Sequence, residues 1–271
     1  MREFTMFQVD AFTDRVFAGN PAAVLVSDAP LPEPEMQAIA AENNLAETVF
    51  VTGAGAARAL RWFTPVKEVA FCGHATLASA HVLATEYGAK GPIAFATRKV
   101  GELIVIPRAD GAYDLDFPAL PPDPLNPLPD SLTALFNEMP VAGARNFENF
   151  FVELASSEAV RNFAPDLAGI AALDGQGLCI TAKGGRSHDG DPVDFVSRYF
   201  APAAGIPEDP VTGSTHATLI PYWADRLGRE DLAAFQASPR GGSLRGRRAG
   251  DRVILTARAV TFMRATIVLP S

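Results

Sequence analysis

The sequence predicts an α+β protein made of two pseudo-equivalent halves, each a barrel-like β-sheet wrapped around a central helix. Three observations support this prediction: short strand-like runs dominate the first half, two helical stretches carry almost no charge, and parts of the first half recur in the second. A helix that is apolar on every side is normally enclosed by other elements. Strands are the elements available to enclose these two helices.

The strands expected in the first half are short runs rich in β-branched and aromatic residues. They cover Phe4 to Phe12, Ala22 to Val26, Thr48 to Thr52, Ala59 to Phe63, Ile93 to Thr97, Leu103 to Pro107 and Tyr113 to Phe117. One helix is expected over 34–44, where prolines stand at its start. The central helix is expected from His74 to a stop at Gly88, and Glu86 is its one charged residue.

The second half repeats two short pieces of the first half. Arg-Trp-Phe-Thr-Pro at 61–65 matches Arg-Tyr-Phe-Ala-Pro at 198–202, and His-Ala-Thr-Leu at 74–77 recurs unchanged at 216–219. The spacing between the pieces is longer in the second copy, which indicates an insertion between strand and helix. A second central helix is therefore expected over 215–227, with Gly228 as its stop.

A proline-rich segment separates the two halves. Six prolines lie between Pro118 and Pro129, a density that neither a helix nor the interior of a sheet tolerates. We interpret 118–129 as a linker between an N-terminal domain, 1–117, and a C-terminal domain, 130–271. The last strand can pack on either half.

Composition restricts the classes of function. The chain has 271 residues and a net charge of −8, which argues against binding to a nucleic-acid backbone. We expect no membrane span, because no apolar run approaches 18 residues, and no secretory signal, because the first residues alternate between apolar and polar. The two cysteines, Cys72 and Cys179, are expected to be free thiols in a cytoplasmic protein.

Both central helices are entered through a glycine, Gly73 in the first copy and Gly213 in the second. Glycine allows a ligand to approach the backbone closely, and the free amides and positive dipole end of a helix start attract an anion. A small carboxylate-bearing substrate fits two such starts. Titratable groups stand beside them, His74 at one entry and Asp209 at the other.

Each titratable candidate also has a purely structural explanation. His74 can be a helix-capping or packed histidine, and Asp209 before a proline can be a turn residue. Glu47 lies in an apolar stretch at the start of a strand, where a carboxyl group is either exposed at the strand end or buried as a general acid or base. No metal site is expected, since the spacing of His188, Asp189 and Asp191 matches no common ligand set.

Four ordered blocks identify a family. FQVDAFTDRVFAGNPAAVLV, AENNLAETVFV, RWFTPVKEVAFCGHATLASAHVLA and RYFAPAAGIPEDPVTGSTHATLIPYW together resemble the PhzF-like isomerases of phenazine biosynthesis, from about residue 6 to residue 255. The resemblance implies the diaminopimelate-epimerase-like fold, in which two sheet-around-helix halves place the active site between them. It also implies a homodimer, and the expected strands over 253–269 supply edges that need covering.

The resemblance implies roles for particular residues. A glutamate at the position of Glu47 shuttles a proton between carbons of a dihydro-hydroxyanthranilate in the phenazine enzyme, and the groups matching His74 and Asp209 hold the substrate and assist protonation. Positions 73, 213 and 214, which are Gly73, Gly213 and Ser214, match helix starts that bind polar groups of the substrate. Asn20, in Gly-Asn-Pro, is a further candidate for substrate binding. No metal or organic cofactor is implied.

Two alternatives remain open at this point. Epimerases and racemases of this fold use one thiol from each half, but the second helix entry here offers Ser214 and Thr215, and Cys179 lies in a strand-like run. A two-thiol racemase is therefore the less favoured hypothesis. A chemical role for Cys72 stays open. The other alternative is a non-catalytic protein that binds small carboxylates on the same fold.

Overall fold

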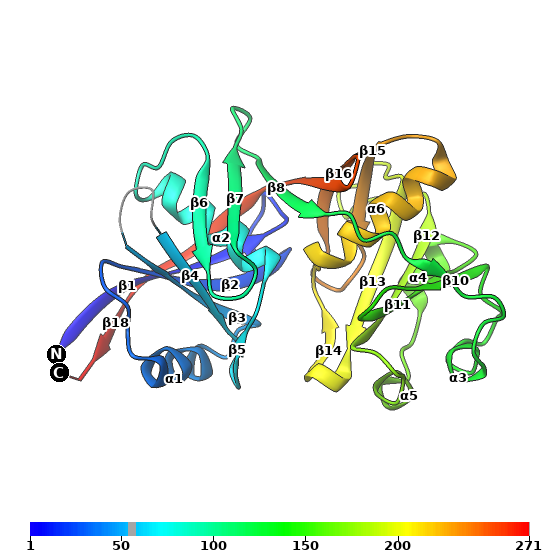
Figure 1. Ribbon diagram of the computed structural model, residues 1–271, viewed down its shortest axis with the longest axis horizontal. Coiled ribbons are helices and arrows are strands. Elements are labelled where there is room, and N and C mark those ends of the chain that lie inside the picture. Colours follow the sequence, from blue (N-terminus) through cyan, green and yellow to red (C-terminus); the bar gives the residue numbers. More distant parts are fainter. Residues whose placement is uncertain (54–57, 271) are drawn as a thin grey trace. The chain divides into compact units, whose positions relative to one another are not determined.

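The computed structural model describes residues 1–53 and 58–270, which form two compact units (Figure 1). Unit 1 comprises 1–116 and 256–271, and unit 2 comprises 117–255. The chain passes between the units within one strand, Tyr113–Pro118, and returns within another, Arg252–Ala257. Within the described residues, no helix is long and apolar enough to cross a membrane.

Unit 1 contains two helices, α1 (Glu33–Asn43) and α2 (Gly73–Thr85). Its strands are β1 (Arg2–Ala11), β2 (Asn20–Ser27), β3 (Glu47–Thr52), β4 (Arg58–Phe63), β5 (Glu68–Val69), β6 (Ile93–Thr97), β7 (Glu102–Pro107), β8 (Tyr113–Pro118) and β18 (Ala259–Leu269). The last strand, β18, pairs along its length with β1. The sequence had left its place open between the two halves.

Unit 2 contains α3 (Asp130–Thr133), α4 (Ser157–Asn162), α5 (Leu167–Ala171), a 3₁₀ turn (Pro202–Ala204) and the long helix α6 (Gly213–Leu227). Its strands are β9 (Asp123–Pro124), β10 (Ala142–Arg145), β11 (Asn149–Glu153), β12 (Gly177–Lys183), β13 (Phe195–Ala201), β14 (Ile206–Asp209), β15 (Asp231–Gln236), β16 (Gly242–Ala249) and β17 (Arg252–Ala257).

The strands of the two units pair in the same pattern. In unit 1, β2 runs parallel to β3, β3 antiparallel to β4, and β4 pairs antiparallel with β5 and parallel with β6. In unit 2, β11, β12, β13, β14 and β15 repeat these four pairings with the same directions. The predicted α+β class with two pseudo-equivalent halves is confirmed.

Each unit encloses its long helix. In α2, the residues from Gly73 to Leu83 are buried apart from the half-buried His81. This helix packs against β1, β2, β3, β7 and β18. In α6, Ser214 is the exposed residue in a first turn that is otherwise buried, and the helix packs against β15 and β16. Burial of most of their residues explains why both helices are largely apolar.

The proline-rich segment 118–129 belongs to unit 2 rather than forming a free connection. Asp123–Pro124 pairs with β10, a place where an edge strand tolerates proline. The Leu120 amide donates a hydrogen bond to the Ala217 carbonyl at 3.0 Å. Pro221, which lies four residues further along α6, has no N–H to offer that carbonyl. The segment therefore completes the hydrogen bonding of α6.

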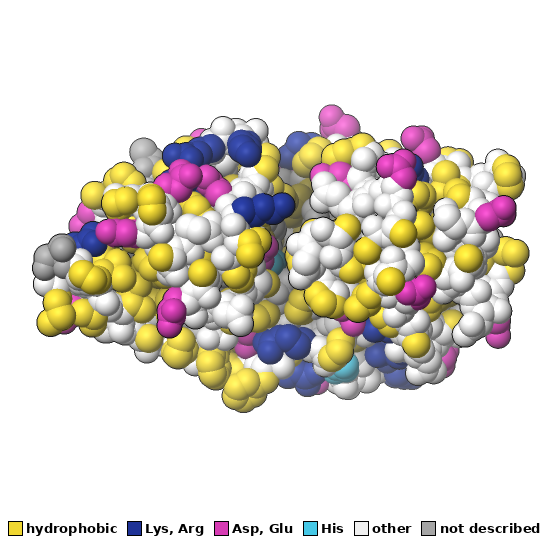
Figure 2. Space-filling view, turned by 90° about the horizontal axis from the view of Figure 1, so that it is seen from below, with side chains coloured by type: hydrophobic (Ala, Val, Ile, Leu, Met, Phe, Trp, Pro, Cys, Tyr) yellow, Lys and Arg dark blue, Asp and Glu magenta, His cyan; other side chains and the backbone are white. Residues whose placement is uncertain are grey.

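The surface shown in Figure 2 mixes side chains of every type. Basic and acidic side chains are interspersed over the face shown in Figure 2, together with scattered apolar ones.

Candidate active site

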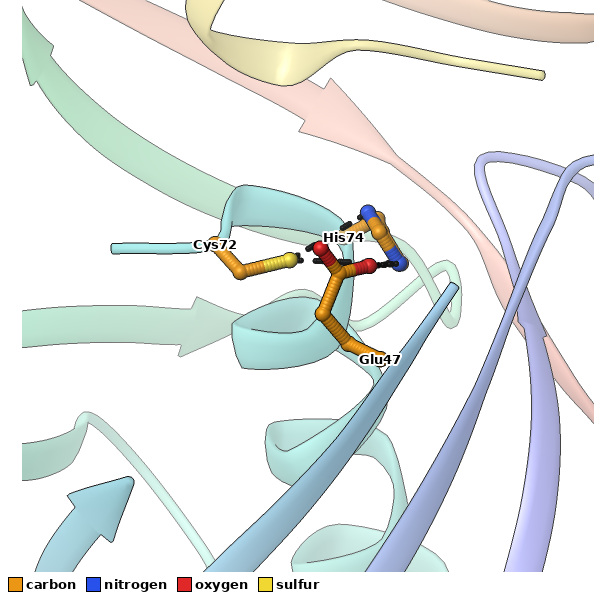
Figure 3. A group of neighbouring side chains, drawn as sticks. All are labelled: Glu47, Cys72 and His74. Atoms are coloured by element: carbon orange, nitrogen blue, oxygen red, sulfur yellow. Dashed lines mark hydrogen bonds and ion pairs between the residues drawn. The ribbon is translucent and has the colours of Figure 1, made fainter. Parts of the chain in front are cut away.

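Glu47 and His74 form the centre of the candidate site in unit 1 (Figure 3). Glu47 is the first residue of β3, and His74 is the second residue of α2. His74 Nε2 lies 2.9 Å from Glu47 Oε2, and both side chains are buried, with relative exposures of 6% and 8% for the two residues. A carboxylate and an imidazole in contact away from water are suited to moving a proton.

Asn20 sets the position of the proton on the neutral imidazole. Its Nδ2 lies 3.2 Å from His74 Nδ1, and an amide nitrogen can only donate. Nδ1 therefore accepts, which leaves the ring hydrogen on Nε2, facing the Glu47 carboxylate. Gly19 makes this placement of Asn20 possible, because it has φ +63° and a Cβ there would collide with the Ala11 carbonyl oxygen.

Cys72 is the third member of this buried cluster. It is the N-cap residue of α2, and its Sγ lies 3.3 Å from His74 Nδ1 and 3.8 Å from Nε2. Burial, and then the Glu47 charge, raise the pKa of the Cys72 thiol to about 11, so it is protonated at neutral pH. This thiol is not an activated nucleophile, but its sulfur can accept a hydrogen bond when Nδ1 carries a proton.

The charge state of His74 follows from two opposing effects. Burial lowers the pKa of His74, but the anionic forms of Cys72 and Glu47 and their hydrogen bonds outweigh it and raise that pKa well above 6.5. Because the Cys72 thiol is protonated at neutral pH, we attribute the raised pKa to Glu47. The pair can therefore hold a proton on the imidazole near neutrality.

Glu47, Cys72 and His74 are also ligand types that zinc accepts, and one donor atom from each lies within 4.8 Å of the others. The sulfur lies nearer Nδ1, the nitrogen that faces Asn20, than Nε2, the nitrogen that faces Glu47. The Sγ–Nε2 distance of 3.8 Å and the Nε2–Oε2 contact of 2.9 Å are separations that two ligands of one zinc ion can have.

Asp209 is the candidate acid or base of unit 2. It is the last residue of β14, buried, and placed by the register opposite Tyr199. Its Oδ2 accepts a hydrogen bond from the Thr212 hydroxyl. Its neighbour Glu208 serves a different purpose, because it forms a two-point ion pair with Arg198 at 2.7 and 2.9 Å.

The predicted helix start of unit 2 is present, with Gly213 buried and Ser214 exposed in the first turn of α6. The repeated His-Ala-Thr-Leu, however, falls at different places in the two helices. His74 is the second residue of α2, a position taken by Ser214 in α6, whereas His216 is the fourth residue of its helix. His216 is fully buried, and its Nδ1 lies 2.8 Å from the Thr212 carbonyl, so it is a packed histidine.

Three further side chains contact the candidate residues: Cys72 lies beside His74, and Thr212 and Gln236 bond to Asp209. The sequence leaves a role for Cys72 open and does not mark Thr212 or Gln236 as site residues. The sequence signal for Thr212 is its position directly before Gly213, the glycine that begins α6. Gln236 ends β15 far along the chain, and no local pattern marks it.

Comparison with known proteins defines the family. The family model described as phenazine biosynthesis-like protein, PhzC-PhzF, matches residues 9–265. The chain belongs to this PhzF-like family. An uncharacterized isomerase of Pseudomonas aeruginosa is 44% identical over 98% of this chain and 100% of the relative. The resemblance inferred from the four sequence blocks is confirmed.

Solved structures extend the comparison to the PhzF-like fold. The crystal structure of a phenazine biosynthesis protein of the PhzF family from Enterococcus faecalis has 42% identity and a TM-score of 0.92, covering 99% of this chain and 100% of that one. A hydroxyproline epimerase from Agrobacterium vitis, solved with bound trans-4-hydroxy-L-proline, has 10% identity and a TM-score of 0.60, covering 98% and 92%. The second likeness shows a shared fold alone.

Proposed function

We propose that the protein is a cofactor-independent isomerase that moves a proton on a small carboxylate-bearing, cyclic or unsaturated metabolite. Glu47 is the group that takes and returns the proton. The observation that carries this proposal is the buried 2.9 Å contact between Glu47 Oε2 and His74 Nε2, with Asn20 fixing the other ring nitrogen. We assign His74 and Asp209 as the other titratable groups of the reaction.

The proposed step is balanced without an oxidant or reductant. The Glu47 carboxylate takes a proton from a substrate carbon, and the electron pair of the broken C–H bond enters the adjoining unsaturated system. The carboxylic acid then returns the proton to another carbon, so the product is an isomer. A positioned acid or base of this kind contributes about 10² to 10⁴ in rate.

The substrate carboxylate is proposed to bind at helix starts. In the described chain, neither Cys72 nor Thr212 caps its own helix through its side chain. The amides of the first turns, beginning at Gly73 and Gly213, can therefore receive an anion. Ser214 and Asn20 supply further polar contacts in this proposal.

A racemase that uses one thiol from each unit is less well supported. The N-cap residue of α6 is Thr212, at the place where α2 has Cys72, and a threonine hydroxyl does not replace a thiol as an acid or base. The other cysteine, Cys179, is fully buried within β12.

Deuterium exchange tests the proposed isomerase. The protein is incubated in heavy water with dihydro-hydroxyanthranilate and a panel of small unsaturated carboxylates, and deuterium in substrate and product is measured by mass spectrometry. We expect incorporation that Glu47→Gln removes. Glu102→Gln, at an exposed position of β7, is the matched control and should exchange at the wild-type rate.

Two results would contradict the proposal. A Glu47→Gln protein with full exchange activity would falsify the assigned role of Glu47. Tight binding of a carboxylate with no exchange and no product across the panel would instead favour a non-catalytic binding protein.

A further inference from the structure

Thr212 occupies a helix-capping position without capping the helix. It is the N-cap residue of α6, with φ −117° and ψ 100°, and threonine is one of the residues preferred there because its oxygen can accept an amide hydrogen of the first turn. Within the described part of the chain, its side chain makes no such bond. The hydroxyl bonds to Asp209 Oδ2 instead.

Gln236 connects to both residues from β15. This side chain is fully buried, and its Oε1 accepts the Thr212 backbone N–H at 2.9 Å. Its Nε2 donates to the Asp209 backbone carbonyl at 2.8 Å and to Thr212 Oγ1 at 3.2 Å. Both ends of this amide therefore bond to the two residues at the candidate site.

The directions of these hydrogen bonds are fixed by chemistry. A backbone N–H only donates, so the amide end that faces Thr212 N must be the Gln236 oxygen. The other end is then the NH₂ group, and Thr212 Oγ1 accepts from it. The hydroxyl hydrogen is left to point at Asp209 Oδ2. A donor aimed at a carboxylate stabilises its ionised form.

We propose that Thr212 and Gln236 are positioning residues that hold the Asp209 carboxylate ionised and in one orientation as an acceptor in the proton transfer. This inference rests on the proposed function. Thr212 touches the carboxylate directly, and Gln236 acts through Thr212 and through the Asp209 backbone.

The neighbouring charged and titratable groups are compatible with this role. Tyr199 lies opposite Asp209 in the β13–β14 register, and its hydroxyl donates to Asn149 Oδ1 at 2.9 Å. Burial, and then the negative charge of Asp209, raise the pKa of Tyr199, so the phenol stays neutral. The Glu208 carboxylate is engaged by Arg198.

The experiment measures the titration of Asp209 directly and needs no substrate. The full-length protein is labelled with ¹³C in aspartate carboxyl groups, and the Asp209 signal is assigned by its loss in Asp209→Asn. Carboxyl shifts are then followed against pH in the wild type, Thr212→Val and Thr212→Ser. The valine removes the hydroxyl with little change of shape and no loss of a cap, while the serine keeps the hydroxyl.

We expect Thr212→Val to lower the acid dissociation constant of Asp209 by about tenfold or more, because a hydrogen bond to the charged form is lost. Thr212→Ser, which keeps the hydroxyl, should have the wild-type acid dissociation constant of Asp209. Thr218→Val, which removes another hydroxyl of α6, one bonded to Asn146, should leave it unchanged. Unfolding by urea shows that each variant is folded.

An exchange assay with the same variants supplies the second readout. We expect Thr212→Val to lower kcat for deuterium exchange by about 10- to 100-fold with little change in KM, and Thr212→Ser to keep most of it. An unchanged Asp209 titration in folded Thr212→Val overturns the positioning role. If the wild type exchanges no probe, the proposed function fails, but the titration still decides whether Thr212 controls Asp209.

Discussion

The starts of α2 and α6 are built from the same scaffold and carry different chemistry. In unit 1 the carboxylate comes from Glu47 at the start of β3. The equivalent residue in unit 2 is Gly177. The strand register shows this, because Thr48 pairs with Phe63 in unit 1 and Leu178 pairs with Phe200 in unit 2. In unit 2 the carboxylate comes from Asp209 on β14. Its counterpart in unit 1 is Val69, since Tyr199 pairs with Asp209 as Trp62 pairs with Val69.

Both starts nevertheless use a buried amide to set the direction of a proton. When the His74 imidazole is neutral, its Nδ1 accepts from Asn20 and its N–H faces Glu47. Gln236 donates to Thr212, which leaves the hydroxyl hydrogen facing Asp209. The duplicated fold therefore does not supply two equal acids and bases. It supplies two carboxylates from different strands, each with its own hydrogen-bond donor.

Neutralising the two carboxylates separately tests whether the two units contribute unequally to the reaction. We expect Glu47→Gln to lower the deuterium-exchange rate by about 10² to 10⁴ and Asp209→Asn to lower it by about 10 to 10², because Glu47 takes the proton while Asp209 assists. Exchange rates of both variants at saturating probe decide the order. Equal losses would mean that the two units contribute equivalent acid–base groups.

A second experiment tests the turn that holds Asn20. Gly19→Ala should reduce the free energy of unfolding by about 2 to 4 kcal/mol, because a Cβ at φ +63° meets the Ala11 carbonyl oxygen. Gly228→Ala is the matched control: it has φ +65° with open space around it, and should cost about 1 kcal/mol. Urea unfolding measures both. Equal costs would show that the close backbone approach has no energetic consequence.

The two histidines of the repeated His-Ala-Thr-Leu should respond oppositely to pH. His74 has a raised pKa, so its contribution to stability is complete below pH 6.5 and is lost as pH rises through the raised value. Burial lowers the pKa of His216 to about 4, so its contribution, about 3 kcal/mol at most, is complete above pH 6.5 and is lost as pH falls toward 4.

Imidazole NMR titration and urea unfolding at several pH values measure this difference. His216→Gln should flatten the acid side of the stability curve, and His74→Gln the alkaline side. The half-buried His81, whose pKa burial also lowers to about 4, remains in both variants and provides the internal reference. Parallel titration of His74 and His216 would contradict the distinction between a site residue and a packed one.

The sequence predicts the scaffold better than the site. The two apolar helices, their glycine starts and the repeated strands are local patterns, and each reappears in the structure within a few residues. The repeated His-Ala-Thr-Leu wrongly suggests that His74 and His216 are equivalent. Two extra helical residues precede His216, and its side chain packs in the core. A short sequence repeat does not determine the residue at which a helix begins.

The hydrogen-bond donors of the site are less predictable for a different reason. Gln236 reaches Asp209 and Thr212 across 27 and 24 residues of sequence, and Asn20 reaches His74 across 54. A single glutamine at a strand end carries no periodic signal, so only the pairing of β13 with β15 places it at the start of α6. The role of a residue that strand pairing brings to the site cannot be predicted from its own sequence segment.

The smallest expected effect is that of chelation. EDTA followed by gel filtration should leave the deuterium-exchange rate unchanged, because a carboxylate that moves a proton between carbons needs no Lewis acid. Added zinc should instead inhibit, since it would occupy Glu47 and His74, and Cys72→Ser should weaken that inhibition by removing the third donor. Loss of exchange on chelation, restored by zinc, would show that Glu47, Cys72 and His74 form a metal site rather than a metal-free proton-transfer pair. Unit 1 would then differ from unit 2 in binding a metal.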